Sequence, residues 1–112
     1  MSKKSVYGSH NKNIVLDKNS KNFTIELDSN PTTGYSWHIF KYDTNLFDIV
    51  DHTFFPSKRF IPGAGGRENW VFSLRNVKTI EKNQFKNIEF IYIRPWEPEK
   101  IIKRIIFTVK IN

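Results

Sequence analysis

The sequence contains no cysteine among its 112 residues. This absence excludes a disulfide framework, a zinc site built from thiolates and a cysteine nucleophile, and it favours a reducing compartment. No apolar run approaches the length of a membrane-spanning helix. Residues 1–10 carry charges but lack the apolar stretch of a secretory signal. We therefore expect a cytoplasmic or vesicular protein that does not interact with membranes.

Features typical of helices are also scarce. Alanine occurs once, at Ala64, and the apolar residues show no sustained spacing of three and four. The length suits one domain with a core large enough to fold without metals or disulfides. We expect residues 1–112 to form that domain, with residues 1–11 as a loosely ordered extension.

Apolar and polar residues alternate instead with a period of two, which is typical of strands. The alternation runs through residues 23–27, 35–39, 70–74, 88–92 and 105–111, with shorter apolar pieces at 14–16 and 46–50. It predicts an all-β, immunoglobulin-like antiparallel β-sandwich of seven or eight strands, although a closed barrel also satisfies it. Ten Phe, four Tyr and three Trp supply large side chains for the core.

The first segment outside this alternation is Asn30-Pro31-Thr32-Thr33-Gly34. Proline fixes its own φ and pushes Asn30 toward an extended conformation. Because Gly34 is free to adopt a positive φ, the segment predicts a tight, stiff bend. An ordinary strand connection is the alternative, but a minimal hairpin turn needs far fewer constrained residues.

The second segment is Pro62-Gly63-Ala64-Gly65-Gly66. Glycine-rich loops can bring backbone groups close to a partner. A phosphate cradle is excluded because no Gly-Lys-Ser/Thr follows and no helix is predicted to begin there. A binding loop and a flexible linker both remain open for this segment.

The third segment is Arg94-Pro95-Trp96-Glu97-Pro98. A strand is predicted to end at Ile93, since proline cannot continue a central ladder. Trp96 then lies in a loop between two prolines, whereas Trp37 and Trp70 fall on predicted strands. Tryptophan and arginine are enriched in binding hot spots. The alternative is a tryptophan folded back onto the end of the sandwich.

The three segments fall at strand ends, and in a Greek-key sandwich alternate connections lie at the same end, so we expect one shared edge. Their order resembles the chagasin-like inhibitors of papain-type cysteine peptidases. That family carries Asn-Pro-Thr-Thr-Gly-aromatic, Gly-x-Gly-Gly and Arg-Pro-Trp motifs, matched here by Asn30–Tyr35, Gly63–Gly66 and Arg94–Trp96. Further matches are Trp37, Trp70, Tyr92 and Glu97. The resemblance covers residues 12–112.

The resemblance implies a reversible, tight-binding, non-covalent inhibitor whose three loops plug the active-site cleft of a peptidase. The first loop would cover the catalytic cysteine, with Thr32 and Thr33 near that cysteine and its histidine. The glycine-rich loop would lie along the unprimed side of the cleft, and the third loop would place Arg94 and Trp96 on the primed side. The implied peptidase-binding residues are Asn30, Pro31, Thr32, Thr33, Gly34, Tyr35, Gly63, Ala64, Gly65, Gly66, Arg94, Pro95, Trp96 and Glu97.

Two parts of the chain depart from the family pattern. Residues 76–87 form a rather long polar segment without the glycine at which the family often turns, and the N-terminal extension has no counterpart. Neither part includes any of the three motifs.

The net charge of +7 leaves a second class of function open. It indicates either an acidic partner or simple compositional drift in a chain rich in Lys, Asn, Ile and Phe. A basic β-domain that stacks single-stranded nucleic acid is one alternative, and an immunoglobulin-like adhesion module is another. Stacking platforms need exposed aromatic residues beside cations, whereas the alternation predicts inward-facing aromatics. We therefore expect no nucleic-acid partner.

Catalytic patterns are absent from the sequence. His10, His38 and His52 are scattered, and no recognisable metalloprotease or serine-hydrolase motif is present. Asp43, Asp48 and Asp51 could hold a metal or act as an acid, but a solvated loop explains them better. We expect no enzymatic activity, cofactor or metal, and a monomer whose partners are papain-like cysteine peptidases.

Overall fold

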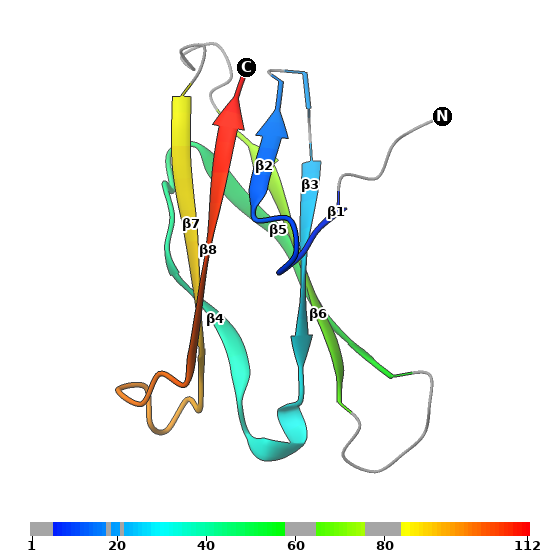
Figure 1. Ribbon diagram of the computed structural model, residues 1–112, viewed down its shortest axis with the longest axis vertical. Helices are drawn as coiled ribbons and strands as arrows, with labels where there is room; N and C mark the ends of the chain where they lie inside the picture. The colour runs from blue at the N-terminus through cyan, green and yellow to red at the C-terminus, as the bar shows by residue number, and fades with distance from the viewer. Residues whose placement is uncertain (1–5, 18, 21, 58–64, 76–83) are drawn as a thin grey trace.

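The computed structural model describes residues 6–17, 19–20, 22–57, 65–75 and 84–112 (Figure 1). Within these ranges the backbone forms strands and one 3-10 turn, η1 (Pro31–Thr33). The strands are β1 (Val6–Tyr7), β2 (Asn13–Leu16), β3 (Asn22–Ser29), β4 (Ser36–Lys41), β5 (Phe47–Pro56), β6 (Gly66–Leu74), β7 (Gln84–Ile93) and β8 (Lys103–Ile111). None of the described residues belongs to a helix long and apolar enough to cross a membrane.

The strands form two four-stranded sheets, in the orders β1-β3-β6-β5 and β2-β8-β7-β4. This arrangement confirms the predicted sandwich and excludes the barrel, because each sheet keeps its own two edges. The expectation of purely antiparallel sheets is wrong at two pairings, since β1 runs parallel to β3 and β2 runs parallel to β8. The N-terminal chain follows the edge of one sheet as β1, turns, and follows the edge of the other sheet as β2 (Figure 1).

Part of the segment expected to be loosely ordered lies along the sandwich. Val6 pairs with Thr24 and Tyr7 with Ile25. The turn that follows is closed by a hydrogen bond of 3.0 Å from the Asn11 N–H to the Gly8 carbonyl. Residues 1–5 lie outside the described residues.

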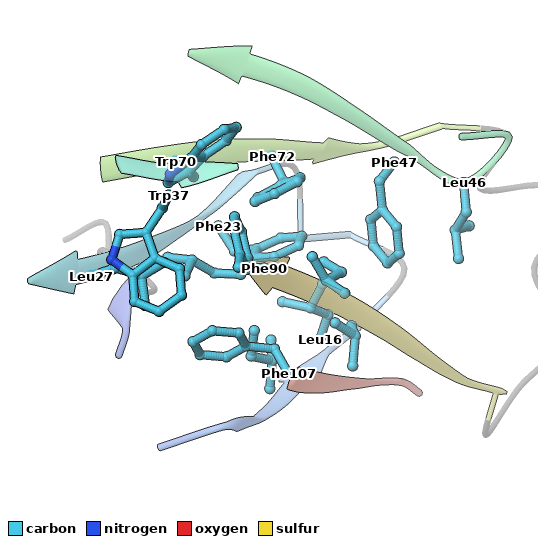
Figure 2. Packing of buried hydrophobic residues seen from close by; sticks show 14 of the residues in the cluster. Leu16, Phe23, Leu27, Trp37, Leu46, Phe47, Trp70, Phe72, Phe90 and Phe107 are labelled. Carbon is cyan, nitrogen blue, oxygen red and sulfur yellow. The ribbon is translucent and has the colours of Figure 1, made fainter. Parts of the chain in front are cut away.

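The core consists of the inward-facing apolar residues of both sheets. Its largest fully buried side chains include five phenylalanines: Phe23, Phe47, Phe72, Phe90 and Phe107. Phe23 stacks on Phe72 within one sheet, and Phe72 meets Phe90 of the other sheet edge to face at 6.2 Å (Figure 2). Burying each such ring contributes about 1.5–3 kcal/mol. The core therefore provides a rigid platform for the loops at its ends.

Two strands differ from their predicted lengths. The apolar piece at residues 46–50 is only the start of β5, which continues to Pro56 because it pairs with β6 along its whole length. An edge strand does not need inward-facing apolar residues along its full length. The apolar–polar alternation therefore did not identify residues 51–56 as part of a strand. In the polar segment 76–87, β7 begins at Gln84, and residues 76–83 lie outside the described residues.

The strand pairings place the strand residues that flank all three predicted loops at one end of the sandwich (Figure 1). We call the strand residues that flank each loop its feet. In one sheet Ser29, Pro56 and Gly66 are neighbours across adjacent strands. In the other sheet Ser36 pairs with Ile93. The shared edge expected from the Greek-key argument is therefore confirmed at the loop feet.

Candidate functional site

The first loop, between β3 and β4, is a closed 3-10 turn. The Gly34 N–H donates to the Pro31 carbonyl at 2.9 Å, and the Thr33 hydroxyl donates to the Asn30 carbonyl at 2.7 Å. The Thr32 hydroxyl donates to the Asn30 side-chain oxygen at 2.6 Å. Gly34 ends the turn with φ of 83°, in the left-handed region that glycine adopts without strain. The predicted stiff bend is thus present, and its proline and threonines are exposed.

The third loop, between β7 and β8, is a tight turn that presents Trp96. The Glu97 N–H donates to the Arg94 carbonyl at 2.9 Å, and these two residues form an isolated β-bridge. The Glu97 carboxylate holds the next turn through an ion pair of 2.8 Å with Lys100. Trp96 at the tip keeps 66% of its surface exposed, so it has not folded back into the sandwich end.

The first and third loops contact each other through Arg94 and Trp96. The Arg94 Nε–H donates to the Thr33 carbonyl at 3.0 Å, and the guanidinium lies 4.3 Å above the Tyr35 ring. The Trp96 indole lies so close to Gly34 that a Cβ on Gly34 would collide with it. We call residues Asn30–Tyr35 and Arg94–Glu97 together the loop ridge, because these contacts join the two loops into one projecting surface.

Tyr92, which is only 5% exposed, supports the loop ridge from below. Its hydroxyl accepts a hydrogen bond of 2.8 Å from the Asn30 N–H, and its ring stacks on Tyr35 with centroids 5.6 Å apart. Trp37 packs on the same ring at 4.9 Å and donates its indole N–H to the Asp28 carbonyl. The sequence identified Tyr92 only as a residue that precedes the Arg-Pro-Trp motif, and it gave no sign that Tyr92 supports the first loop. Its side chain contacts the loop from sixty-two residues away, a relationship that no local pattern reveals.

Only the end of the glycine-rich segment is described, because Gly63 and Ala64 lie outside the described residues. Gly65 has φ of 73°, and a Cβ there would come within 2.8 Å of the Ser29 carbonyl oxygen. A Cβ on Gly66 would collide with the Phe55 carbonyl of the neighbouring strand. Both glycines are therefore required by close backbone packing, and Gly65 brings the foot of the second loop against the foot of the first.

The loop ridge has no group arranged for acid–base or nucleophilic chemistry. Its described carboxylate, Glu97, is paired with Lys100 and lies 3.9 Å from Arg94. In the described part of the chain, no three His, Cys, Asp or Glu side chains come together at metal-binding distance. The ridge is a rigid surface of backbone, hydroxyl, guanidinium and indole groups, which suits recognition of a partner.

The expectation that the aromatic residues face inward is wrong on both sheets, since the phenylalanines at residues 54–55 of β5 are exposed and so are two on the other sheet. Phe40 is 55% exposed beside Arg104, and Phe85 is 63% exposed beside Lys110. Alternation identified the core phenylalanines correctly. It missed these two because each lies where the apolar–polar pattern breaks, at the bulge in β4 and near the polar start of β7.

The fold and loops define a class of protein, an immunoglobulin-like sandwich that presents constrained loops at one end. The chain matches the chagasin family peptidase inhibitor I42 over residues 18–111. It is 31% identical over 103 residues to Amoebiasin-1 from Entamoeba histolytica, covering 92% of this chain and 91% of that one. It is 33% identical to Chagasin from Trypanosoma cruzi over 78 residues, which is 64% of each chain. This protein therefore belongs to the chagasin family of peptidase inhibitors.

The fold agrees with that assignment. The crystal structure of the cysteine protease inhibitor EhICP2 from Entamoeba histolytica superposes with a TM-score of 0.74 at 22% identity, over 96% of this chain and 94% of that one. Because this family is one of peptidase inhibitors, the expectation that the chain is not an enzyme is confirmed.

Proposed function

We propose that this protein is a reversible, tight-binding, non-covalent inhibitor of papain-like cysteine peptidases and that it fills their active-site cleft with three loops. The observation that carries the proposal is the loop ridge, in which Arg94 and Trp96 hold the first loop in one orientation. Family membership supports the inhibitory function, and EhICP2 is named as a cysteine protease inhibitor.

The hydrogen bonds of the first loop explain how it could block a cysteine without being cleaved. The carbonyl of Asn30 accepts from Thr33, that of Pro31 accepts from Gly34, and that of Thr33 accepts from Arg94. Cleavage needs an extended peptide whose carbonyl carbon faces the nucleophile and whose oxygen enters the oxyanion hole. Three carbonyls here are already bonded, and the backbone of Pro31–Thr33 is a 3-10 turn and not an extended peptide, so the loop does not meet that requirement. In the proposed complex Thr32 and Thr33 therefore cover the cysteine and histidine without presenting a scissile bond.

The other loops extend the contact along the cleft. In the proposed complex Arg94 and Trp96 lie on the primed side, and the backbone from Gly63 to Gly66 lies along the unprimed side. Residues already held by hydrogen bonds and stacking lose little conformational entropy on binding, which favours tight association. A contact of about 800 Å² on each partner is usual for peptidase–inhibitor pairs.

The nucleic-acid alternative has some structural support in Phe40 beside Arg104 and Phe85 beside Lys110. Those pairs lie on a sheet face, away from the loop ridge. Binding of single-stranded DNA would weaken steeply with salt, because phosphate contacts release counterions. Fluorescence anisotropy with a labelled oligonucleotide at low salt separates the two functions, and we expect no binding there.

The inhibition experiment is a titration of the purified protein against papain and several cathepsin-type peptidases, with a serine peptidase and a metallopeptidase as controls. We expect stoichiometric loss of activity only in the cysteine peptidases. Activity should return on dilution, and mass spectrometry should show an intact inhibitor chain. Absence of inhibition at micromolar concentration across the cysteine peptidases would contradict the proposal.

A further inference from the structure

The inside of the sandwich holds one charged side chain close to the loop end, Glu68 on β6. Its side chain is only 3% exposed, and Ser29 is the other buried polar residue among those described. A buried carboxylate is costly unless several hydrogen bonds replace its water. The partners of Glu68 therefore show what the group is used for.

One oxygen of Glu68 holds both feet of the first loop. Oε2 accepts the Ser29 hydroxyl hydrogen at 2.6 Å and the Trp37 backbone N–H at 3.0 Å. Ser29 is the last residue of β3 and Trp37 the second residue of β4, so these two bonds fall on either side of Asn30–Tyr35.

The same bonds cross from one sheet to the other. Ser29 and Glu68 lie on neighbouring strands of one sheet, whereas Trp37 lies on β4, the edge strand of the other. The first loop is the chain connection between the sheets at this point. Glu68 therefore joins the two strands that carry the loop, alongside the bond from the Trp37 indole N–H to the Asp28 carbonyl.

The second oxygen of Glu68 ties this arrangement to the strands of the glycine-rich loop. Oε1 lies 2.6 Å from Nε2 of His52 on β5, within hydrogen-bond distance. The His52 ring stacks on Trp70 at 3.6 Å, which fixes its orientation. β5 and β6 are the strands on either side of the second loop, and Gly66 begins β6 two residues before Glu68.

We propose that Glu68 is a positioning residue for inhibition, which orients the first loop relative to strands β5 and β6 without touching the peptidase. This proposal rests on the proposed inhibitory function. Arg94 holds the first loop in place from the third loop, and Glu68 holds it from inside the sandwich. Without Glu68 the sandwich keeps its aromatic core and the bond from the Trp37 indole to the Asp28 carbonyl, but the Ser29 hydroxyl and the Trp37 backbone N–H lose their shared acceptor.

The test compares Glu68→Leu and Glu68→Gln with Glu89→Gln. Glu89 is a matched control, because it is 15% exposed, pairs with Arg104 at 3.1 Å and lies on β7 away from the loop ridge. Inhibition constants and dissociation rates are measured on samples whose folded fraction is established by circular dichroism. We expect Glu68→Leu to weaken inhibition at least about thirtyfold through faster dissociation, Glu68→Gln about threefold to tenfold, and Glu89→Gln less than about twofold.

A second readout does not depend on the peptidase. Amide hydrogen exchange by NMR reports on Trp37 and on Thr33 and Gly34 in the first loop. We expect faster exchange at these amides in Glu68→Leu, with unchanged protection at Phe72 and Phe90 in the core. If wild-type protein inhibits nothing, the proposed function fails, while the exchange data still decide whether Glu68 orders the loop.

Ser29→Ala tests the same role of Glu68 if the Glu68→Leu variant does not fold. It removes one of the two bonds at the loop feet and should weaken inhibition about threefold to tenfold. In the double variant with Glu68→Gln the two losses should be less than additive, because both act on the same bond. The proposal is overturned if Glu68→Leu or Ser29→Ala inhibits like wild type, or if Glu89→Gln loses inhibition to the same extent.

Discussion

The backbone N–H of Asn30 donates a hydrogen bond of 2.8 Å to the hydroxyl of Tyr92, a residue on a strand of the opposite sheet. The Tyr92 ring is buried under Tyr35 and Trp37, so this hydroxyl is held in place by packing. The first residue of the loop ridge is therefore anchored to the core, and the apex from Pro31 to Gly34 projects from a fixed base.

Tyr92→Phe removes that hydroxyl and leaves the aromatic packing in place. We expect inhibition to weaken about threefold to tenfold, with a loss of about 1 kcal/mol in the free energy of unfolding. Tyr42→Phe, on a ring that packs against the core beyond the far end of β4, is the control and should leave inhibition unchanged. Inhibition constants and urea unfolding measure the two effects, and equal inhibition by both variants would show that the anchor is unnecessary.

Arg94→Lys tests whether the guanidinium joins the two loops of the ridge. Lysine keeps the charge but cannot both donate to the Thr33 carbonyl and lie flat over the Tyr35 ring. We expect inhibition to weaken about tenfold or more, chiefly through faster dissociation, which stopped-flow or surface-binding kinetics can measure. Arg75→Lys is the control, since Arg75 pairs with Asp48 at the opposite end of the sandwich. A loss caused equally by both substitutions would show that the effect does not come from the contacts of Arg94 with the first loop.

Trp96→Ala tests the proposed anchor on the primed side of the cleft. We expect a loss of about 2 kcal/mol or more in binding, roughly thirtyfold in the inhibition constant. Stability should change little, because the side chain is 66% exposed. Phe85→Ala is a matched control, with an exposed aromatic ring at 63% that lies outside the loop ridge. If Trp96→Ala binds like wild type, the third loop does not contact the peptidase as proposed.

Asp43 gives a pH prediction that is separate from inhibition. The hydrogen bond from the Lys86 ammonium, assisted by the Asn45 N–H and opposed by partial burial, lowers the pKa of Asp43 below its ordinary value. A carboxyl whose pKa is depressed on folding contributes stability above its unfolded-state pKa, near 3.9, and loses it as the pH falls through the folded value. We expect the contribution to be less than about 1 kcal/mol, because the pair is about one-third exposed.

Lys86→Met should raise the pKa of Asp43 toward its ordinary value and reduce stability at pH 7 but not at pH 2. Carbon-detected NMR titration of the Asp43 carboxyl and urea unfolding at both pH values measure these changes. Inhibition should be unaffected, since this pair lies at the end of the sandwich opposite the loop ridge. An unshifted Asp43 titration in the variant would show that Lys86 is not the cause.

Much of the fold could be predicted because strand periodicity is a local property. The alternation of Phe23, Ile25 and Leu27 predicts one buried face, and those residues are at most 2% exposed in the folded chain. Local patterns failed where a strand gains its pairing from a neighbour alone, as in residues 51–56 of β5 and in the short strand β1. Pairing partners and sheet edges depend on contacts between distant parts of the chain.

By itself, the sequence determined most of the strands, the stiff turn at Pro31 with its left-handed glycine, and the three motifs that mark the family. These follow from backbone geometry and side-chain alternation, which act over a few residues. Only the tertiary structure decided that Arg94 reaches Thr33, that Tyr92 anchors Asn30 and that Glu68 joins both feet of the first loop. Each of these contacts joins residues brought together by strand pairing or by the packing of two sheets, and no local spacing encodes either.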